Sequence, residues 1–265
     1  MNSFSIPSAQ NVLQIPDLVA FWDFQEPSNA PRISRGPRPI ALEVCGKVER
    51  AEVGVFGPYG ARFTGEGYLG ASRKDAPELG IGGAGAQVSI LAWLRREECR
   101  NWGGCECVAG VWNEHAKRQY ALFLNLRIWD SSQQIGAHVS DIGGPTRGFK
   151  YCMDAAIGQT PIPQNEWVFA ALTFDGREAR AYLNGVLDAR EGRNPLPFPR
   201  ALFDGGPNGA DFTVGAVARP VSVGDDGTEN GSIMGNPFFG VLGGLAVFNR
   251  ALSASEMANL AAKTL

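Results

Sequence analysis

Hydrophobic and polar residues alternate along most of the chain, which is the period of two expected of half-buried β-strands. Turn residues, mainly Gly, Pro, Asn and Asp, separate the alternating segments. Helical segments do not alternate with the strands, so the pattern predicts an all-β sandwich and not a parallel sheet. The predicted strands are 18–24, 61–64, 68–71, 88–94, 107–112, 120–126, 134–140, 167–174, 179–183, 186–190, 212–216 and 239–248.

Two hairpins stand out in the middle of the chain. Segment 167–174 is apolar at both parities, which predicts a central strand covered on both faces. It is followed by a turn at Asp175-Gly176 and, after segment 179–183, by a turn at Asn184-Gly185. Asn-Gly is a strong hairpin signal because both central residues of the turn need a positive φ.

A short helix is predicted at the C-terminal end. Ser253 and Glu256 have the spacing of a capping box, with Ser253 as the N-cap. Leu252 and Met257 fit the hydrophobic contact that often accompanies such a cap, and Leu260 extends the apolar stripe. A helix this short is marginal alone in water, so we expect it to pack against the sandwich.

The chain reads as one domain. Its 34 Gly and 17 Pro are spread along the whole length, as expected of many short strands joined by tight turns. There is no linker and no internal repeat, and sandwiches of this length often form one unit. We therefore expect residues 1–265 to form a single domain with a core from about 18 to 262.

Several of these segments resemble laminin-G-like domains of the concanavalin A-like lectin and glucanase superfamily. The resemblance is carried by the hairpin segments 166–176 and 181–185, by the strands 19–24 and 88–94, and by the last strand with its following helix, 239–257. It implies a two-sheet antiparallel jelly roll that binds glycans on its concave face or on loops at the sheet edge. Many relatives carry an acidic pair in the last strand, where this chain has Gly243 and Gly244, which argues against a structural calcium ion there.

Charge and hydropathy exclude some partners. The net charge of −3 comes from interspersed residues of both signs, without a run of Lys and Arg that could follow a phosphate backbone or dock on a membrane. No apolar run approaches the roughly 20 residues of a membrane span. We therefore expect neither nucleic-acid binding nor membrane insertion. Residues 1–17 do not read as a signal peptide, so the compartment stays open between the cytoplasm and the exterior after removal of a leader.

The densest group of functional side chains lies between two predicted strands, where a turn is expected. Aromatic rings can stack on sugars, and amide, carboxylate and guanidinium groups can bond their hydroxyls. We predict a glycan-binding site here; the alternative is a solvated hairpin whose rings point into the core. The predicted ligand-binding residues are Trp112, Asn113, Glu114, His115, Arg118 and Tyr120.

A second loop is a candidate calcium site. Oxygen-rich loops can hold calcium, although acidic turns without metal are common. The candidate ligands are Asp225, Asp226, Glu229 and Asn230.

The cysteines leave three readings open. Five is an odd number, which argues against a complete disulfide framework. Cys99, Cys105 and Cys107 lie close in sequence to His115, which allows a zinc site or a disulfide from Cys99 to Cys105 or Cys107. Buried free thiols are the interpretation that we favour.

Catalysis is not expected. Glycosidases of this fold carry an E-x-D-x-x-E strand, and no E-x-D occurs in the chain. We therefore predict a non-catalytic carbohydrate-binding or adhesion module. Trp102 and Trp129 are possible additional platforms. One alternative is a polysaccharide lyase or hydrolase, with His138, Tyr151 and Arg147 as a lyase-type group, and the other is a protein-interaction or structural domain.

Overall fold

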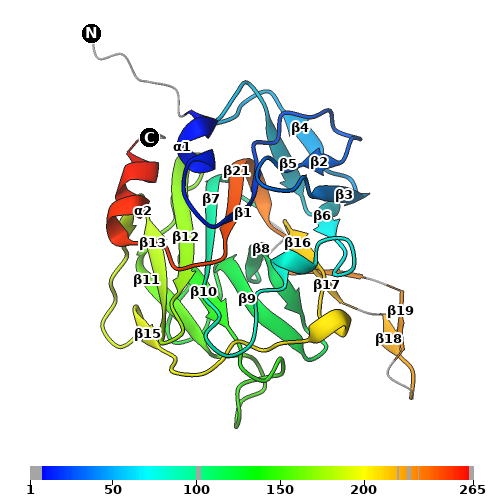
Figure 1. The fold of residues 1–265 in the computed structure, drawn as a ribbon, viewed down its shortest axis with the longest axis vertical. Helices are drawn as coiled ribbons and strands as arrows, with labels where there is room; N and C mark the ends of the chain where they lie inside the picture. Colours follow the sequence, from blue (N-terminus) through cyan, green and yellow to red (C-terminus); the bar gives the residue numbers. More distant parts are fainter. Residues whose placement is uncertain (1–7, 100–102, 220, 226–227, 232, 263–265) are drawn as a thin grey trace.

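The protein is a sandwich of two antiparallel β-sheets stacked face to face (Figure 1). The computed structural model describes residues 8–99, 103–219, 221–225, 228–231 and 233–262. The architecture confirms the all-β prediction and the short C-terminal helix. No helix within these residues is long and apolar enough to cross a membrane.

The first sheet has nine strands, and its centre is formed by the strands whose sequences are apolar at both parities. The order is β14-β13-β12-β7-β21-β5-β4, with β1 also paired to β21 and β15 to β13. The bounds are β1 Leu18–Trp22, β4 Glu49–Ala51, β5 Gly60–Thr64, β7 Val88–Arg96, β12 Trp167–Phe174, β13 Glu178–Leu183, β14 Val186–Leu187, β15 Leu196–Pro197 and β21 Phe239–Phe248.

The second sheet has eight strands in the order β11-β10-β9-β8-β16-β6-β3-β2. The bounds are β2 Arg32–Ile33, β3 Ala41–Gly46, β6 Gly67–Ala71, β8 Glu106–Asn113, β9 Lys117–Leu124, β10 Gln134–Val139, β11 Ala155–Pro161 and β16 Phe212–Val214.

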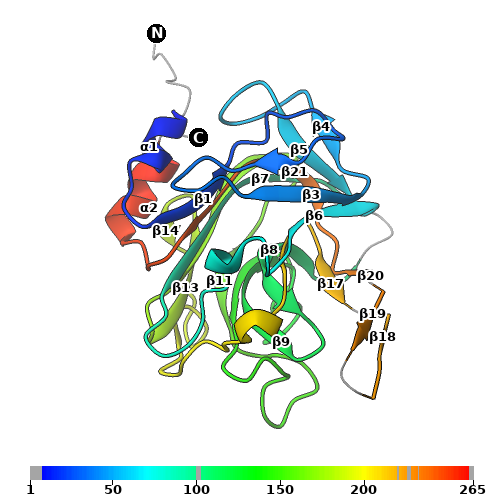
Figure 2. The same ribbon diagram turned by 45° about the vertical axis from the view of Figure 1, so that its right-hand side comes forward.

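An arm projects from the body of the sandwich between β16 and β21 (Figure 2). It contains two small antiparallel pairs, β17 with β20 and β18 with β19. The bounds are β17 Val217–Arg219, β18 Ser222–Val223, β19 Glu229–Asn230 and β20 Ile233–Gly235.

Alternation along the strands divides the apolar residues between two faces of each sheet. On the second sheet, Val111 and Leu122 point into the core between the sheets. Their neighbours Trp112, Ala121 and Phe123 form a separate cluster on the outward face of that sheet. Large apolar side chains on an outward face need a cover or a ligand, so this cluster is a candidate for function.

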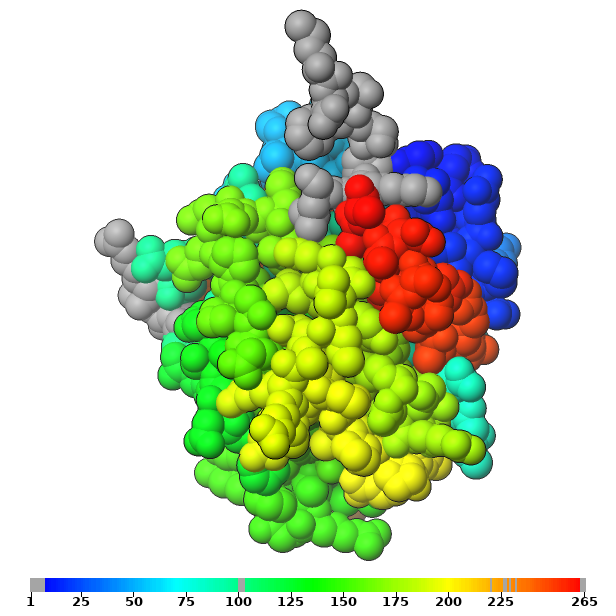
Figure 3. Space-filling view, turned by 90° about the vertical axis from the view of Figure 1, so that its left-hand side faces the viewer, coloured from blue at the N-terminus to red at the C-terminus, as the bar shows by residue number. Residues whose placement is uncertain are grey.

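The outward face of the first sheet is covered by both helices. Met257 and Leu260 of α2 (Ala254–Ala261) and Val12 of α1 (Ala9–Leu13) belong to one buried cluster with Trp93 and Phe169. Figure 3 shows α2 (red) on this surface beside the N-terminal segment (blue). The helix therefore packs on the sandwich as predicted, and β12 is buried on both faces.

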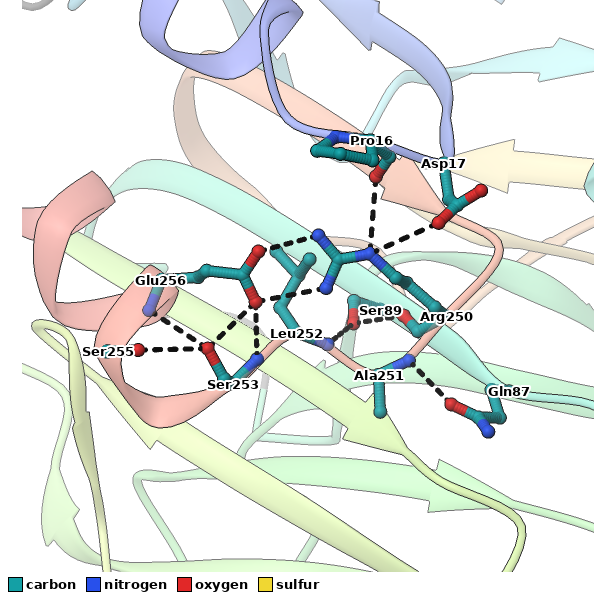
Figure 4. Close-up of polar contacts among 10 residues, drawn as sticks. All are labelled: Pro16, Asp17, Gln87, Ser89, Arg250, Ala251, Leu252, Ser253, Ser255 and Glu256. Atoms are coloured by element: carbon teal, nitrogen blue, oxygen red, sulfur yellow. Dashed lines mark hydrogen bonds and ion pairs between the residues drawn. The ribbon is translucent and has the colours of Figure 1, made fainter.

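The capping box of α2 forms as the sequence predicts (Figure 4). Ser253 Oγ accepts from the Glu256 backbone N–H at 3.3 Å, and Glu256 Oε2 accepts from the Ser253 N–H at 2.8 Å. Arg250 adds donors to both Glu256 oxygens, at 3.0 and 2.6 Å. The hydrogen bond from Arg250 and those from Ser253 lower the pKa of Glu256 to about 2.

Gly243 and Gly244 mark a β-bulge in β21. A Cβ at Gly243 would lie 3.0 Å from the ring of Trp167, and one at Gly244 would overlap Phe56 and lie 3.0 Å from Trp93. The glycines therefore leave room for aromatic rings on both sides of the bulge.

Most predicted strands are present with shifted ends, and both turns form. Asn184 and Gly185 have φ values of 50° and 82°, as their turn requires. Strands β2, β3, β4 and β11 and the arm strands β17 to β20 were not predicted. The two longest of these, β3 and β11, mix exposed and buried positions irregularly, so their sequences lack a clean period of two. The predicted strand 186–190 ends at Leu187, and segment 194–209, which the strand pattern left without an element, contains β15 and the short 3₁₀ helix Gly206–Asn208.

Candidate ligand-binding site

A pocket of about 360 Å³ opens on the outward face of the eight-stranded sheet. This volume is within the range of roughly 300–1,000 Å³ that is usual for small-molecule sites. Strands β8, β9 and β10 form its floor, and the loops after β9 and before β11, together with the base of the arm, form its rim. The lining residues are Gly104, Cys105, Trp112, Glu114, Arg118, Phe123, Leu126, Arg127, Ile128, His138, Tyr151, Cys152 and Asn236.

Three rings form the floor of the pocket. The ring centroid of Trp112 lies 5.7 Å from that of Phe123 and 4.8 Å from that of His138, and Phe123 and His138 are 5.3 Å apart. All three residues are buried. Strands β8, β9 and β10 each contribute one of the rings. The rings share a face because neighbouring antiparallel strands place opposed residues on the same side of the sheet.

His138 is held as a neutral ring. Its Nδ1 lies 3.2 Å from the carbonyl oxygen of Asp154, which can only accept, so Nδ1 carries the proton in this contact. Burial, together with the nearby positive charge of Arg118, lowers the pKa of His138 to about 3. The imidazole therefore adds an uncharged, partly polar surface to the floor at neutral pH.

Charged and amide groups surround the rings. Arg118 lies directly opposite Trp112 in the β8–β9 ladder, and its guanidinium carbon is 5.9 Å from the Trp112 ring. Glu114 Oε1 accepts from Asn236 Nδ2 at 3.0 Å, which ties the β8–β9 turn to the base of the arm. Arg127 is exposed on the rim, and its Nε donates to Asn125 Oδ1 at 3.4 Å.

Exposed aromatic rings continue the site beyond the pocket. Tyr151 lines the pocket and is 58% exposed, and Phe149 is 47% exposed. The ring of Phe149 contacts that of Trp129 at 5.7 Å, and Arg193 lies over Trp129 at 4.6 Å. Large exposed rings on a monomer surface often mark a binding site.

The loop that carries Trp129 has an unusual backbone. Asn125, Arg127, Trp129 and Asp130 all have φ between 51° and 58°, in the left-handed region that non-glycine residues rarely adopt. Trp129 Nε1 donates to the carbonyl of Met153 at 2.9 Å, which fixes the indole against the loop before β11. Such strain is found at ligand-binding sites more often than elsewhere.

No two of the five cysteines are joined by a disulfide; Cys107 and Cys152 are buried, and Cys45, Cys99 and Cys105 are partly buried. Cys105 and Cys152 line the pocket, and burial raises the pKa of each thiol to about 11. Both are therefore protonated at neutral pH and poor nucleophiles. Within the described part of the chain, no three His, Cys, Asp or Glu side chains are grouped closely enough to hold a metal ion.

The structure brings together only part of the site predicted from sequence. Trp112, Glu114 and Arg118 line the pocket. Asn113 lies in the turn, where its Oδ1 accepts from the N–H of the exposed His115 at 2.8 Å. Contrary to the prediction, Tyr120 does not lie in the pocket. It points into the core between the sheets, and its hydroxyl donates a hydrogen bond to the carbonyl of Leu79.

A β-bulge in β9, opposite Val111 and Trp112, explains why Arg118 lines the pocket and Tyr120 does not. Its extra residue, Gln119, puts Arg118 and Tyr120 on opposite faces of the sheet although they are two residues apart. Sequence reasoning also missed Phe123, Arg127 and Asn236. Alternation along β9 could have indicated Phe123, whereas Asn236 reaches the pocket only through the fold.

The other candidates are placed as follows. His138 and Tyr151 line the same pocket, and Arg147 is not among the lining residues. Asp225 and Asn230 are exposed on the β18–β19 hairpin, whereas Asp226 and Trp102 lie outside the described residues. The side chain of Glu229 is likewise not described, so calcium binding by this loop stays a prediction.

Comparisons with solved structures give the same fold. Domain 4 of the arabinanase AbnA from Geobacillus stearothermophilus, in complex with arabinotriose, is 16% identical with a TM-score of 0.57, over 92% of this chain and 98% of that domain. A botulinum neurotoxin DC binding domain in complex with rat synaptotagmin II is 9% identical with a TM-score of 0.59. A Trypanosoma rangeli sialidase in complex with sialic acid is 13% identical with a TM-score of 0.58.

Coverage differs among these structures. This chain is matched over 94% of its length by both the toxin domain and the sialidase, but it spans 52% of the former and 33% of the latter. At such identities the likeness establishes the fold alone. A comparison of the sequence with curated proteins gave no match.

The sequence also matches a family model, Laminin_G_3, over residues 70–258. This range begins in β6 and ends in α2, and it includes every strand of the pocket floor. Together with the two-sheet architecture, the match establishes that the chain belongs to the concanavalin A-like lectin/glucanases superfamily.

Proposed function

We propose that the protein is a non-catalytic carbohydrate-binding module whose ligand occupies the pocket over β8, β9 and β10. The observation that carries this proposal is the combination of Trp112, Phe123 and His138 on the floor with hydrogen-bonding groups on the rim. Apolar ring surfaces suit the faces of sugar rings, and polar rim groups suit their hydroxyls.

The exposed rings beside the pocket favour an oligosaccharide over a single sugar. Tyr151 is at the pocket edge, and Phe149 and Trp129 follow on the neighbouring loops. A chain of sugars anchored in the pocket would continue over these rings. The complex of the matched arabinanase domain with arabinotriose supports a glycan ligand for a domain of this fold and length.

One observation favours a second candidate, a polysaccharide lyase. His138 and Tyr151 lie in one pocket, and a lyase needs a base and a group that donates a proton. The low pKa of His138 makes it a weak base, which places this candidate second. Incubation with uronate polymers tests it through the ultraviolet absorbance of unsaturated products, which His138→Ala should abolish if the lyase is correct.

The primary proposal is tested on a broad glycan array, with calcium and, in parallel, with a chelator. We expect binding that is lost in Tyr151→Ala and kept in Tyr59→Ala, a control ring that stacks on Arg50 away from the pocket. Binding that disappears with the chelator would assign calcium to the loop of Asp225. No binding in either condition would overturn the proposal and leave the protein-interaction alternative.

A further inference from the structure

Arg118 is a buried cation that has no counter-ion among the described residues. The residue is 7% exposed, and its side chain donates one hydrogen bond, from Nη1 to the carbonyl of Gly143 at 3.3 Å. No carboxylate of the described residues forms an ion pair with it. A guanidinium has five N–H donors, so most of its bonding capacity is left for the pocket that it lines.

Among the described residues, two other arginines are buried, and each of them has strong hydrogen-bonding partners. Arg96, 4% exposed, pairs with Glu106 at 2.5 Å, and its Nε lies 3.2 Å from both carboxylate oxygens. Arg32, 1% exposed, donates to three backbone carbonyls of the loop before β2. A buried charge without such partners is costly, so its presence at Arg118 needs a compensating role.

Arg118 shares the pocket with two other charged side chains, Glu114 and Arg127. Burial lowers the pKa of His138 and raises that of Cys152, and the positive charge of Arg118 acts to lower both pKa values. Glu114, the carboxylate among the lining residues, instead raises the pKa values of Cys105 and Cys107. Its Oε1 is also already bonded to Asn236, so Glu114 does not neutralise Arg118.

We propose that Arg118 receives an anionic substituent of the glycan, a carboxylate or a sulfate ester, and that the ligand of this pocket is therefore an acidic oligosaccharide. This inference rests on the proposed glycan-binding function. A guanidinium can bond both oxygens of such a group in parallel, which fixes its orientation as well as its place. Arg127 on the exposed rim adds a second positive charge along the entry.

The position of Arg118 should make the pocket selective for acidic over neutral sugars. The floor beneath it consists of the rings of Trp112 and His138, and His138 stays neutral, so no other cation on the floor competes for the anion. A neutral sugar in the same place would shield the guanidinium from water without supplying a negative charge to pair with it. Acidic and neutral forms of one oligosaccharide should therefore differ strongly in affinity.

The test is calorimetric titration with matched pairs of oligosaccharides: uronate oligomers and their methyl esters, sialyllactose and lactose, and a sulfated oligomer with its desulfated form. We expect at least one acidic member to bind about ten- to one-hundred-fold more tightly than its neutral partner. In Arg118→Met this difference should disappear, while Arg118→Lys should keep part of it. Arg35→Met, the same substitution at an exposed arginine paired with Asp23, should leave it unchanged.

Thermal unfolding separates a ligand role from a structural one. Arg118→Met removes an unpaired buried charge, so its melting temperature should equal or exceed that of the wild type, whereas Arg96→Met should melt lower because Glu106 loses its partner. A large drop in Arg118→Met would overturn the inference. So would equal affinity for acidic and neutral glycans, although glycan binding itself would then stand. Absence of binding to every glycan would instead overturn the proposed function.

Discussion

The imidazole of His138 lies against the indole of Trp112, with ring centroids 4.8 Å apart and an angle of 42° between the planes. The two residues come from β10 and β8 and meet across β9, on the outward face of the sheet. Burial lowers the pKa of His138 and keeps the imidazole neutral, so the centre of the candidate site is sensitive to acid although it carries no charge at neutral pH.

The first prediction concerns this histidine. Its pKa is about 3 in the folded protein and near 6.5 in the unfolded chain, so the unfolded chain binds the extra proton between these values. The contribution of neutral His138 to the free energy of unfolding is fully present above pH 6.5. It is lost as the pH falls toward 3, by up to about 1.4 kcal/mol per pH unit. Chemical denaturation of wild type and His138→Phe between pH 7 and pH 4 measures this, and a parallel dependence in both proteins would contradict it.

Tyr120 should matter for stability and not for binding. Its hydroxyl is buried and donates to the carbonyl of Leu79, so Tyr120→Phe leaves that carbonyl without its partner. We expect a loss of about 1–3 kcal/mol in the free energy of unfolding. Glycan affinity should be unchanged, because the residue faces the core between the sheets. A Tyr120→Phe protein that is fully stable but does not bind glycan would show that the side chain reaches the ligand.

The cap of α2 should contribute measurably to stability. Ser253→Ala removes the acceptor for the Glu256 N–H and should cost about 1 kcal/mol. Ser253→Asp retains a capping oxygen and serves as the matched control, with most of the stability expected to remain. Urea titration of the three proteins checks the order, and equal loss in both variants would show that the hydroxyl itself, not its capping, is required.

Acid should weaken the same cap. The pKa of Glu256 is lowered to about 2 by Arg250 and Ser253, so its stabilising effect is present above the unfolded value near 4.5 and is lost as the pH falls toward 2. Glu256→Gln should lower stability at pH 7 and flatten the dependence of stability on pH in that window. Glu191→Gln, at an exposed turn position, should do neither.

The glycines of the β21 bulge give a steric prediction. A Cβ at Gly244 would overlap Phe56 and approach Trp93, so Gly244→Ala should destabilise the fold by about 1–3 kcal/mol. Gly144→Ala is the control, because its Cβ would meet only the carbonyl oxygen of Ile142, at 4.0 Å. Thermal unfolding compares the two, and similar melting temperatures would mean that the rings move aside freely.

Local signals made much of the fold predictable. The Asn184-Gly185 turn depends on the φ values that these two residues favour, and the Ser253–Glu256 cap depends on groups three residues apart. The double-sided apolar pattern of 167–174 reports burial on both faces wherever its partners come from. Interactions of this kind are encoded within a few neighbouring residues, so the sequence alone was enough to predict them.

The composition of the pocket was decided by the tertiary structure. The bulge at Gln119 in β9 set Arg118 outward and left Tyr120 inward, whereas strand alternation alone would have put both on one face. His138 and Asn236 reach the same pocket from strands and loops far apart in the sequence. In the sequence, nothing distinguishes Arg118 from other charged residues. The pairing of the strands buries it with no counter-ion in the described part of the chain, because burial and partners depend on contacts between distant segments.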